Sequence, residues 1–482
     1  MVPRDNCSQR SIPPIRATAA RIIRRTVDVP ALASAARPPF ALRARVLTPL
    51  AAGGTRFIPD GTVVVDAAGR IAAVDETSAL PMVEAIDLRP WLLLPGLVDL
   101  HAHLPQLPNA GLGAGMDLLA WLDRYIFPLE RDFDVAAAER VAPAAFRTFA
   151  RAGTTTMVLY GAVYEASLDA VFRAAEAHGC RAVIGKVMMD RLRYDEQLPD
   201  SAVLETSLRQ SADLCARWHG RDGGRLRYAF SPRFAVSCSA EMLRQSAALA
   251  AAAGAYWQTH LSEDRGEMAE VARLFPAARD YTDVYDQAGG LGPRAILAHA
   301  IHLSHREIGR LAETGTRIAH CPESNLFLAS GVMPLARYRE AGLVVGLGSD
   351  VAAGPDVSIF RQMRVGAQSE AVLVALAGER RPVLDPLGWL RMGTLEGARA
   401  LGLEASIGSL EAGKEADLIA VDAALTAPIP GPELERPDEL MSRLIFRDHP
   451  DMVRAAWVRG RPLDGPAMAS SSATASGTGR QA

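Results

Sequence analysis

The sequence predicts a TIM-type (β/α)8 barrel joined to a small β-sandwich domain that is built from both chain ends. The middle of the chain alternates apolar strand-like runs with helix-length segments, a pattern typical of parallel βαβ units. The strand-like runs number eight, which is the number that closes a TIM barrel. Both flanks of this region carry short β-like runs separated by turns. We therefore expect an α/β barrel inserted between the two halves of a β domain.

The predicted β-sandwich domain consists of residues 39–94 and 402–465. In its first half, Asp66-Ala-Ala-Gly69-Arg lies between two apolar runs and is a hairpin signal. The second half contains IGSLEAGKEADLIAVD followed by VRAAWVRGRPL, again with short apolar runs. Pairing of the two halves brings the chain ends together and leaves residues 95–401 as the inserted barrel.

Both chain ends are predicted to lie outside these domains. Residues 1–38 contain seven arginines against two acidic residues. This composition fits a disordered N-terminal extension, a transit segment or a start codon upstream of the true one. Residues 466–482, rich in Ser and Ala, are predicted to form a flexible tail. Neither end is expected to carry chemistry.

The predicted barrel strands are short apolar runs bounded by breakers or polar residues, as expected for strands buried on both faces. The helix after the first strand, Met116–Phe127, has an apolar stripe and is expected to stop at Pro128. Other helix-length segments are residues 135–152, 162–178, 239–253 and 304–313. The eight strand-like runs are residues 92–100, 154–160, 181–189, 226–230, 256–259, 295–298, 316–319 and 343–348.

Composition excludes several classes of partner. The 52 basic and 55 acidic residues give a net charge of −3, which indicates neither nucleic acid nor an anionic membrane as partner. No apolar run approaches the roughly 18 residues that a membrane span needs. The five cysteines are odd in number and lack CxxC spacing. They predict reduced thiols in a cytoplasmic protein, without a disulfide framework or a thiolate metal site.

Polar side chains follow most of the predicted barrel strands, at the point where each strand ends. In a TIM barrel the carboxyl ends of the strands meet at one face, where catalytic groups lie. Six of the ten histidines belong to this set. Scattered core histidines would not gather in this way, so the pattern predicts a metal site. The residues at the strand ends are His101 and His103, Ser231 to Phe234, His260 and Glu263, His299 and His302, His320 to Asn325, and Ser349 and Asp350.

Four of these residues form a ligand set for one metal ion. Neutral imidazoles of His101, His103 and His260, with the Asp350 carboxylate, suit zinc or iron and leave one position for water. A bound metal lowers the pKa of that water from 15.7 to about 7, which supplies hydroxide at neutral pH. Asp350 is also expected to accept a proton from the water.

Two further residues at the strand ends are candidates for catalysis. Glu263, three residues after His260, can reach back over the metal as a proton shuttle. His299 is expected to hydrogen-bond the attacking water or to polarise the substrate, and its direct coordination of the metal stays open.

The motifs PGLVDLHAH, HLSE, HAIHL, HCPESN and GLGSD occur in this order. With them the chain resembles the amidohydrolase superfamily, specifically its branch of purine and pyrimidine deaminases. Within that branch, HAHLPQ, LLAWLDRYIFPLE, SPRFA and THLSEDRGE are similar to the guanine deaminases. The resemblance implies hydrolytic deamination of guanine to xanthine and ammonia, one zinc ion per subunit with iron as the alternative, and a homodimer.

The resemblance also implies roles for individual residues. It assigns proton transfer to Glu263, catalytic roles to His299 and Asp350, and metal binding to the four ligands named above. An amide, a guanidinium fork and an apolar ring suit the edge and face of a neutral aromatic bicycle. The residues that match the purine-binding set are Gln106, Arg233, Phe234 and His260.

Two departures bear on the number of metals and on the substrate. Two-metal amidohydrolases often carry a carbamylated lysine after strand four, where this chain has Arg233, whose pKa above 12 excludes carbamylation. The loop VAAGPDVS after strand eight differs from the more Gly/Ser-rich family pattern, so Pro355 or Asp356 leaves a related heterocycle open. The alternatives are 8-oxoguanine, a pterin or an aminotriazine. A cyclic-amide hydrolase and a metal-free barrel scaffold rank lower.

Overall fold

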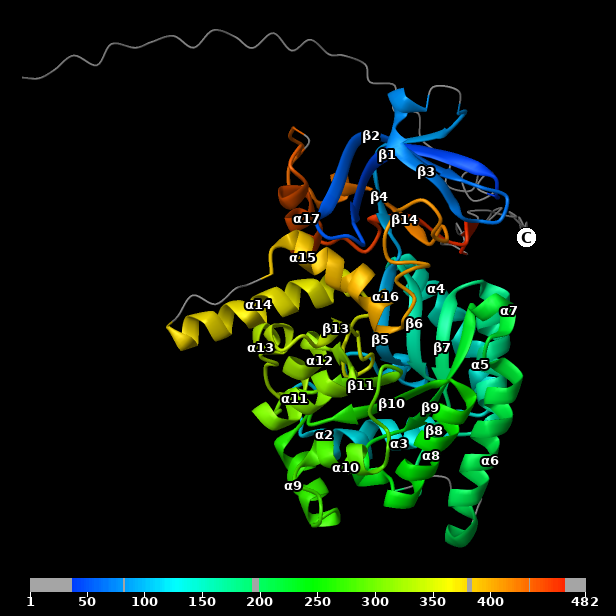
Figure 1. Ribbon diagram of the computed structural model, residues 1–482, viewed down its shortest axis with the longest axis vertical. Helices are drawn as coiled ribbons and strands as arrows, with labels where there is room; N and C mark the ends of the chain where they lie inside the picture. Colours follow the sequence, from blue (N-terminus) through cyan, green and yellow to red (C-terminus); the bar gives the residue numbers. More distant parts are fainter. Residues whose placement is uncertain (1–36, 81–82, 193–198, 379–383, 433, 464–482) are drawn as a thin grey trace, which may run out of the picture.

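Two β-sheets organise the chain: a parallel sheet formed by its middle and a smaller sheet formed by its two ends (Figure 1). The computed structural model describes residues 37–80, 83–192, 199–378, 384–432 and 434–463. The predicted N-terminal extension lies outside these residues except for positions 37 and 38, and the predicted tail lies outside them entirely. Both therefore stay predictions.

The parallel sheet is a nearly closed barrel, which confirms the predicted TIM-type fold. Its strands follow the order β13-β12-β11-β10-β9-β7-β6-β5, and β8 pairs with β9. After β13, the Asp350 backbone N–H donates to the His101 carbonyl at 2.7 Å and joins the last strand to the first. The strands are β5 (Leu97–His103), β6 (Thr154–Tyr160), β7 (Arg181–Gly185), β8 (Val187–Met188), β9 (Leu226–Pro232), β10 (Tyr256–Leu261), β11 (Ala295–His299), β12 (Arg317–His320) and β13 (Val344–Leu347).

Helices follow the barrel strands and cover the outside of the barrel (Figure 1). Their ends carry the expected signals: α11 begins at a capping box of Ser304 and Glu307 and ends at Gly315, whose φ is +68°. The helices are α4 (Val135–Arg151), α5 (Glu165–His178), α6 (Asp200–Trp218), α7 (Arg221–Gly224), α8 (Ala240–Ala253), α9 (Arg265–Leu274), α10 (Tyr281–Gln287), α11 (His305–Thr314), α12 (Pro322–Phe327), α13 (Leu335–Glu340), α14 (Ile359–Ala377), α15 (Pro386–Arg391) and α16 (Gly397–Ala400). Short helical turns are η2 (Leu104–Asn109), η4 (Ala235–Ser237) and η5 (Met392–Glu396).

The smaller sheet pairs the two ends of the chain, as predicted. Its order is β16-β15-β14-β4-β1-β2-β3, and the antiparallel pair of β4 with β14 joins the N-terminal strands to the C-terminal ones. Its strands share one apolar cluster that includes Val46, Leu93, Leu418 and Trp457. The elements are β1 (Phe40–Pro49), β2 (Thr55–Val65), β3 (Ile71–Glu76), η1 (Thr77–Ala79), β4 (Ile86–Pro95), β14 (Leu418–Val421), η6 (Ala423–Thr426), α17 (Pro437–Phe446), β15 (Val453–Val458) and β16 (Arg461–Pro462). The exact domain boundaries stay a prediction.

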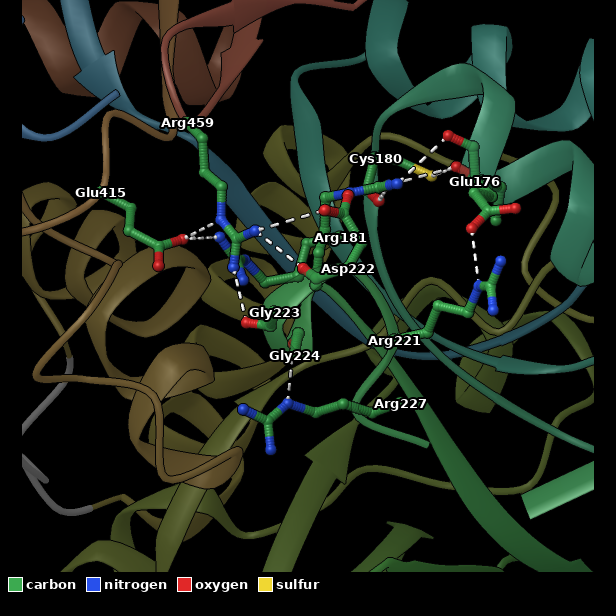
Figure 2. A network of polar contacts seen from close by, with 12 residues as sticks. Glu176, Cys180, Arg181, Arg221, Asp222, Gly223, Gly224, Arg227, Glu415 and Arg459 are labelled. Atoms are coloured by element: carbon green, nitrogen blue, oxygen red, sulfur yellow. Dashed lines mark hydrogen bonds and ion pairs between the residues drawn. The ribbon is translucent and has the colours of Figure 1, made fainter. Parts of the chain in front are cut away.

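A buried charge network joins the amino end of the barrel to the smaller sheet (Figure 2). Arg181, the first residue of β7, donates to Asp417 Oδ2 at 3.0 Å and also to Glu415, both of which precede β14. Arg459, which follows β15, donates to Glu415 at 2.8 Å and to the carbonyl of Asp222 at 2.8 Å. We call the side chains of Arg181, Arg459, Glu415 and Asp417 the amino-end network. It lies at the end of the barrel opposite to the predicted metal site.

The structure corrects two sequence predictions. The run 92–100 is two strands, because β4 ends at Pro95 in the smaller sheet and β5 begins at Leu97 in the barrel. The helix after β5 continues past Pro128: α2 (Leu118–Trp121), a π-helical turn η3 (Leu122–Ile126) and α3 (Phe127–Arg131) form one continuous segment. The widened turn precedes the proline, which removes the clash that a proline makes with the preceding turn of a regular α-helix.

Within the described residues, none of the helices combines the length and the apolar character that crossing a bilayer requires.

Candidate active site

Four predicted ligands converge at the carboxyl ends of β5 and β10 and in the loop after β13. His101 Nε2 and His103 Nε2 lie 3.1 and 3.3 Å from Asp350 Oδ1. His103 Nε2 lies 3.2 Å from His260 Nε2. One possible ligand atom from each of these four buried residues lies within 4.8 Å of the others. The barrel therefore gathers residues that are separated by up to 249 positions in the chain.

The geometry of this cluster fits a metal ion. Ligand atoms in a tetrahedral zinc site with bonds of about 2.0–2.1 Å lie roughly 3.3 Å apart. His260 Nδ1 lies 2.5 Å from the carbonyl oxygen of Arg233. Because a carbonyl only accepts, Nδ1 carries the proton and Nε2 presents its lone pair to the cluster. Within the described residues, His101 Nε2 and His299 Nε2 are buried without a hydrogen-bond partner, as expected for atoms that face a cation.

Burial favours the neutral imidazole at two histidines of the cluster. Burial lowers the pKa of His103 to about 4 and holds the pKa of His260 well below its usual value. Burial by itself would raise the pKa of Asp350. The neighbouring His101 and His299 outweigh this effect and hold the pKa of Asp350 well below its usual range. Neutral nitrogen donors and one carboxylate are a donor set that zinc and iron both accept.

Glu263 and His299 form a second side of the cluster. His299, the last residue of β11, places Nε2 at 3.3 Å from Glu263 Oε2 and 3.7 Å from Asp350 Oδ2. Its Nδ1 lies 2.9 Å from the amide oxygen of Asn325, which fixes the ring. Burial, with a further contribution from Asp350, raises the pKa of Glu263 well above its usual value. A carboxyl group whose pKa is raised in this way can donate a proton and take it back.

Neighbouring polar groups hold Asp350 and the end of β5 in place. Ser324 Oγ donates to Asp350 Oδ2 at 2.6 Å. The buried Asp99 carboxylate accepts from Ser349 Oγ at 2.5 Å and from the His101 backbone N–H at 3.1 Å. Asp99 thereby ties the strand that carries two predicted ligands to the loop that carries a third.

Backbone strain is concentrated at these strand ends. Ser262, His299, Ala300 and Asp350 have φ values of +48°, +67°, +51° and +49°. Each such residue costs on the order of 1–3 kcal/mol and persists where the surroundings over-determine its conformation, as at functional sites. Gly348 is needed for close packing here, because a Cβ at this position would lie 2.8 Å from the His101 Cβ.

A pocket opens directly beside the cluster. Its empty volume is about 350 Å³, part of it continuous with solvent. The lining residues combine an apolar wall with polar groups that converge on one side, which is typical of small-molecule sites. They are His103, Gln106, Leu118, Trp121, Leu122, Arg233, Phe234, His260, Glu263, Asp350 and Ala353.

The structure brings the predicted substrate residues together in this pocket. Gln106 lies in η2, Arg233 follows β9, and Phe234 is the next residue. Behind them lies Glu130, which sequence reasoning missed. Glu130 Oε1 accepts from Gln106 Nε2 at 2.6 Å, and its Oε2 accepts from Arg233 at 2.5 Å. The PLE segment that follows the helix stripe contained the only signal, a carboxylate two residues after a proline.

Other predicted strand-end residues lie outside the cluster. His302 Nε2 lies 2.8 Å from the Ser330 carbonyl oxygen, and burial lowers the pKa of His320 to about 3. Of the VAAGPDVS loop, Ala353 lines the pocket, whereas Asp356 turns toward Arg361 at 3.0 Å. Neither Pro355 nor Asp356 lines the pocket, so an influence of these residues on the accepted heterocycle stays a prediction.

Comparisons with known proteins agree with this architecture. The model of the Amidohydrolase family matches residues 92–463. A probable guanine deaminase of Deinococcus radiodurans is 37% identical over 415 residues, which cover 83% of this chain and 92% of that relative. The crystal structure of guanine deaminase from C. acetobutylicum, with guanine bound in its active site, has a TM-score of 0.81 and 28% identity and covers 88% of this chain and 100% of that one. An adenosine deaminase from Xanthomonas campestris with bound zinc has a TM-score of 0.73 and 28% identity and covers 88% and 92% of the two chains.

Proposed function

This chain belongs to the amidohydrolase family, and we propose that it hydrolyses guanine to xanthine and ammonia. One observation carries the proposal: a pocket lies directly against the histidine–aspartate cluster, and Glu263 lines this pocket beside the cluster. The polar groups on one side of the pocket match the edge of a guanine ring. The relative from Deinococcus radiodurans is a probable guanine deaminase, and the guanine deaminase structure from C. acetobutylicum holds guanine in its active site.

We propose that the cluster holds one zinc ion per subunit, with His101, His103, His260 and Asp350 as ligands. The zinc in the Xanthomonas relative and the donor set of three imidazoles and one carboxylate support this choice, and iron accepts the same donors. When bound, the metal would act as a Lewis acid and lower the pKa of a coordinated water to about 7.

The residues of this chain then supply the proton transfers. Glu263, whose pKa burial raises well above its usual value, donates a proton to the ring nitrogen next to the carbon that carries the exocyclic amine. Water adds to that carbon and gives one proton to Glu263, which passes it to the departing amine. As the C–N bond breaks, the former water oxygen becomes the carbonyl oxygen and its second proton returns to Glu263. His299 Nε2, 3.3 Å from Glu263, is placed to accept a hydrogen bond from the attacking water. The products are xanthine and ammonia, and Glu263 ends in its starting state.

Binding of the purine is assigned to the other side of the pocket. Arg233 presents guanidinium donors to the carbonyl and ring nitrogens of the substrate, and Gln106 presents its amide. Phe234 offers an apolar surface to the ring, while Trp121 and Leu122 exclude water from the far wall. A homodimer stays a prediction of the family resemblance, and a cytoplasmic location stays a prediction of the cysteine pattern.

The decisive experiment is ammonia release from a panel of heterocycles by protein of known metal content. The panel contains guanine, 8-oxoguanine, a pterin, an aminotriazine, adenine and cytosine. Guanine should give the highest kcat/KM. If guanine is inert and another member releases ammonia, the proposed substrate is wrong while the hydrolytic reaction stands. If no member releases ammonia with metal present, the deaminase assignment itself fails.

A further inference from the structure

We propose that Glu130 is the positioning residue of the substrate pocket and that it sets the preference of this pocket for a neutral heterocycle over an anion. Its carboxylate contacts both polar residues assigned to the purine, Gln106 at 2.6 Å and Arg233 at 2.5 Å. All three side chains are buried, with 2%, 1% and 3% of Glu130, Gln106 and Arg233 exposed. The inference rests on the proposed function, because it assigns a role in that same pocket.

The π-helical turn η3 explains how Glu130 reaches the pocket. Leu118, Trp121 and Leu122 line the pocket from one face of the helical segment. In a regular α-helix, at about 100° per residue, residue 130 would lie roughly 120° away from Leu118. The turn η3 accommodates one extra residue and removes about 100° of this rotation. Glu130 therefore lies on the pocket face and is buried, whereas Leu129 is only half-buried.

Glu130 offsets the charge of Arg233. A buried guanidinium without an opposite charge would attract anions strongly, because little water screens it. The Glu130 carboxylate at 2.5 Å offsets this charge while the remaining guanidinium donors keep their direction. The Arg233 guanidinium also lies 5.5 Å from the centre of the Phe127 ring, which orients the fork from its other face. The pocket thus offers hydrogen-bond donors without a net positive charge on this side.

Glu130 also determines which way the Gln106 amide faces. A carboxylate only accepts hydrogen bonds, so the amide nitrogen must face Glu130 and the amide oxygen must face away. The oxygen lies 3.5 Å from the backbone nitrogen of Ala352, in the loop after β13. Both ends of the amide are therefore specified before a ligand enters. A pre-oriented amide loses less entropy on binding and discriminates between heterocycles whose edges exchange donors for acceptors.

Glu130→Gln tests the proposal, with xanthine as the probe of charge. Xanthine loses a ring proton slightly above neutral pH, so one compound can be offered as a neutral molecule or as an anion. In Glu130→Gln, the KM for guanine should rise about 10- to 100-fold, with a smaller fall in kcat. The preference between neutral and anionic xanthine, measured by calorimetry at pH 6 and pH 9, should shift toward the anion by about tenfold or more. If both the KM for guanine and the preference between neutral and anionic xanthine equalled those of the parent, the proposal would be overturned.

Glu415→Gln is the matched control. It also removes a carboxylate that contacts two arginines, but a half-buried one in the amino-end network, away from the pocket. It should leave KM and the xanthine preference unchanged. A loss of stability alone would appear in both variants, whereas a changed preference for charge should appear only in Glu130→Gln. A shift of the same size in both variants would overturn the proposal.

Glu130→Asp decides the question if Glu130→Gln does not fold. It keeps the charge and shortens the side chain by one methylene, so KM should rise about tenfold while the xanthine preference stays at the parent value. A parent KM in Glu130→Asp would overturn the positioning role. Failure of the proposed function is distinguishable, because the parent would then release no ammonia from guanine, whereas the xanthine comparison requires no turnover.

Discussion

The two ends of the barrel both contain buried charges, but they differ in how these charges are matched. In the amino-end network, Arg181 and Arg459 both donate to Glu415 (Figure 2). Arg181 also donates to Asp417 at 3.0 Å. At the carboxyl end, four imidazoles converge with the side chains of Asp350 and Glu263, and among the described residues no arginine or lysine is part of this group. The first arrangement is complete as it stands, whereas the second is complementary to a cation.

Titration behaviour shows the same difference. Burial raises the pKa of Glu415, but Arg181 and Arg459 outweigh it and leave this pKa below its usual range. At the other end, burial raises the pKa of Glu263 well above its usual value, and nearby Asp350 raises it further. The comparison teaches that buried charge by itself does not identify a functional site. Unmatched buried groups that converge on a pocket do.

The largest expected effect tests the carboxyl end. Glu263→Gln should lower kcat for guanine by about 10²- to 10⁴-fold, because it removes the group that moves protons, while metal content and melting temperature stay near the parent values. Steady-state kinetics and elemental analysis measure this. Glu270→Gln changes a partly exposed carboxylate of α9, serves as the control and should keep the parent kcat. Near-parent turnover in Glu263→Gln would remove its role as proton shuttle.

The next effect tests the amino end. Arg181→Met should lower the free energy of unfolding by about 3–5 kcal/mol, because it leaves Glu415 and Asp417 buried without one of their cations. At a temperature where the variant is folded, kcat and KM should match the parent. Urea unfolding provides the measurement, and Arg221→Met, which removes an exposed arginine next to the same network, should change stability far less. A large fall in kcat of folded Arg181→Met would contradict the separation of the two ends.

The smallest expected effect concerns how stability depends on pH, which should have opposite signs for carboxyl groups at the two ends of the barrel. Burial raises the pKa of Glu267, which supports the Glu263 backbone, from 4.5 to about 7. The folded state then binds more protons than the unfolded state between these values, so this group stabilises the protein at low pH and the contribution is lost as pH rises toward 7. The free energy of unfolding of Glu267→Gln, measured relative to that of the parent, should therefore increase by about 2 kcal/mol as the pH is raised from 5 to 8.

The amino end should respond in the opposite direction. The pKa of Glu415 is lowered, so its contribution is present at neutral pH and is lost as pH falls through its folded value. The deficit of Glu415→Gln relative to the parent should therefore shrink in acid. Denaturant unfolding of both variants at several pH values measures the two slopes. Slopes of the same sign would show that the two ends are not electrostatically distinct.

Much of the fold could be predicted because its signals are local. The run 154–160 coincides with β6, and the remaining barrel strands lie within a few residues of their predicted runs. The exception is the run 92–100, where apolar residues continue from one sheet into the other and only Gly96 marks the change. The predicted end of the helix at Pro128 was wrong for a related reason. A single π-helical turn leaves no recognisable periodicity in the hydrophobic pattern of the sequence, so the continuation of the helix past the proline could not be predicted.

The candidate site could be predicted only in part. His101, His103, His260 and Asp350 stand out because a polar residue at the end of a buried strand is costly without a function. Glu130 does not stand out, since it follows a proline in an ordinary helical pattern and its partners lie 24 and 103 positions away. Asn325, which orients His299, lay within a motif but had no signal that distinguished its role.

The sequence by itself determined the barrel, the order of the predicted ligands along it and the family, because strand burial and strand-end polarity are written into neighbouring residues. The tertiary structure decided which polar atoms face one another. Closure of the barrel sets the distances between Asp350 and the histidines of β5, and one extra residue in η3 turns Glu130 toward Arg233. Such distances depend on register and rotation summed over many residues, so no local pattern can contain them.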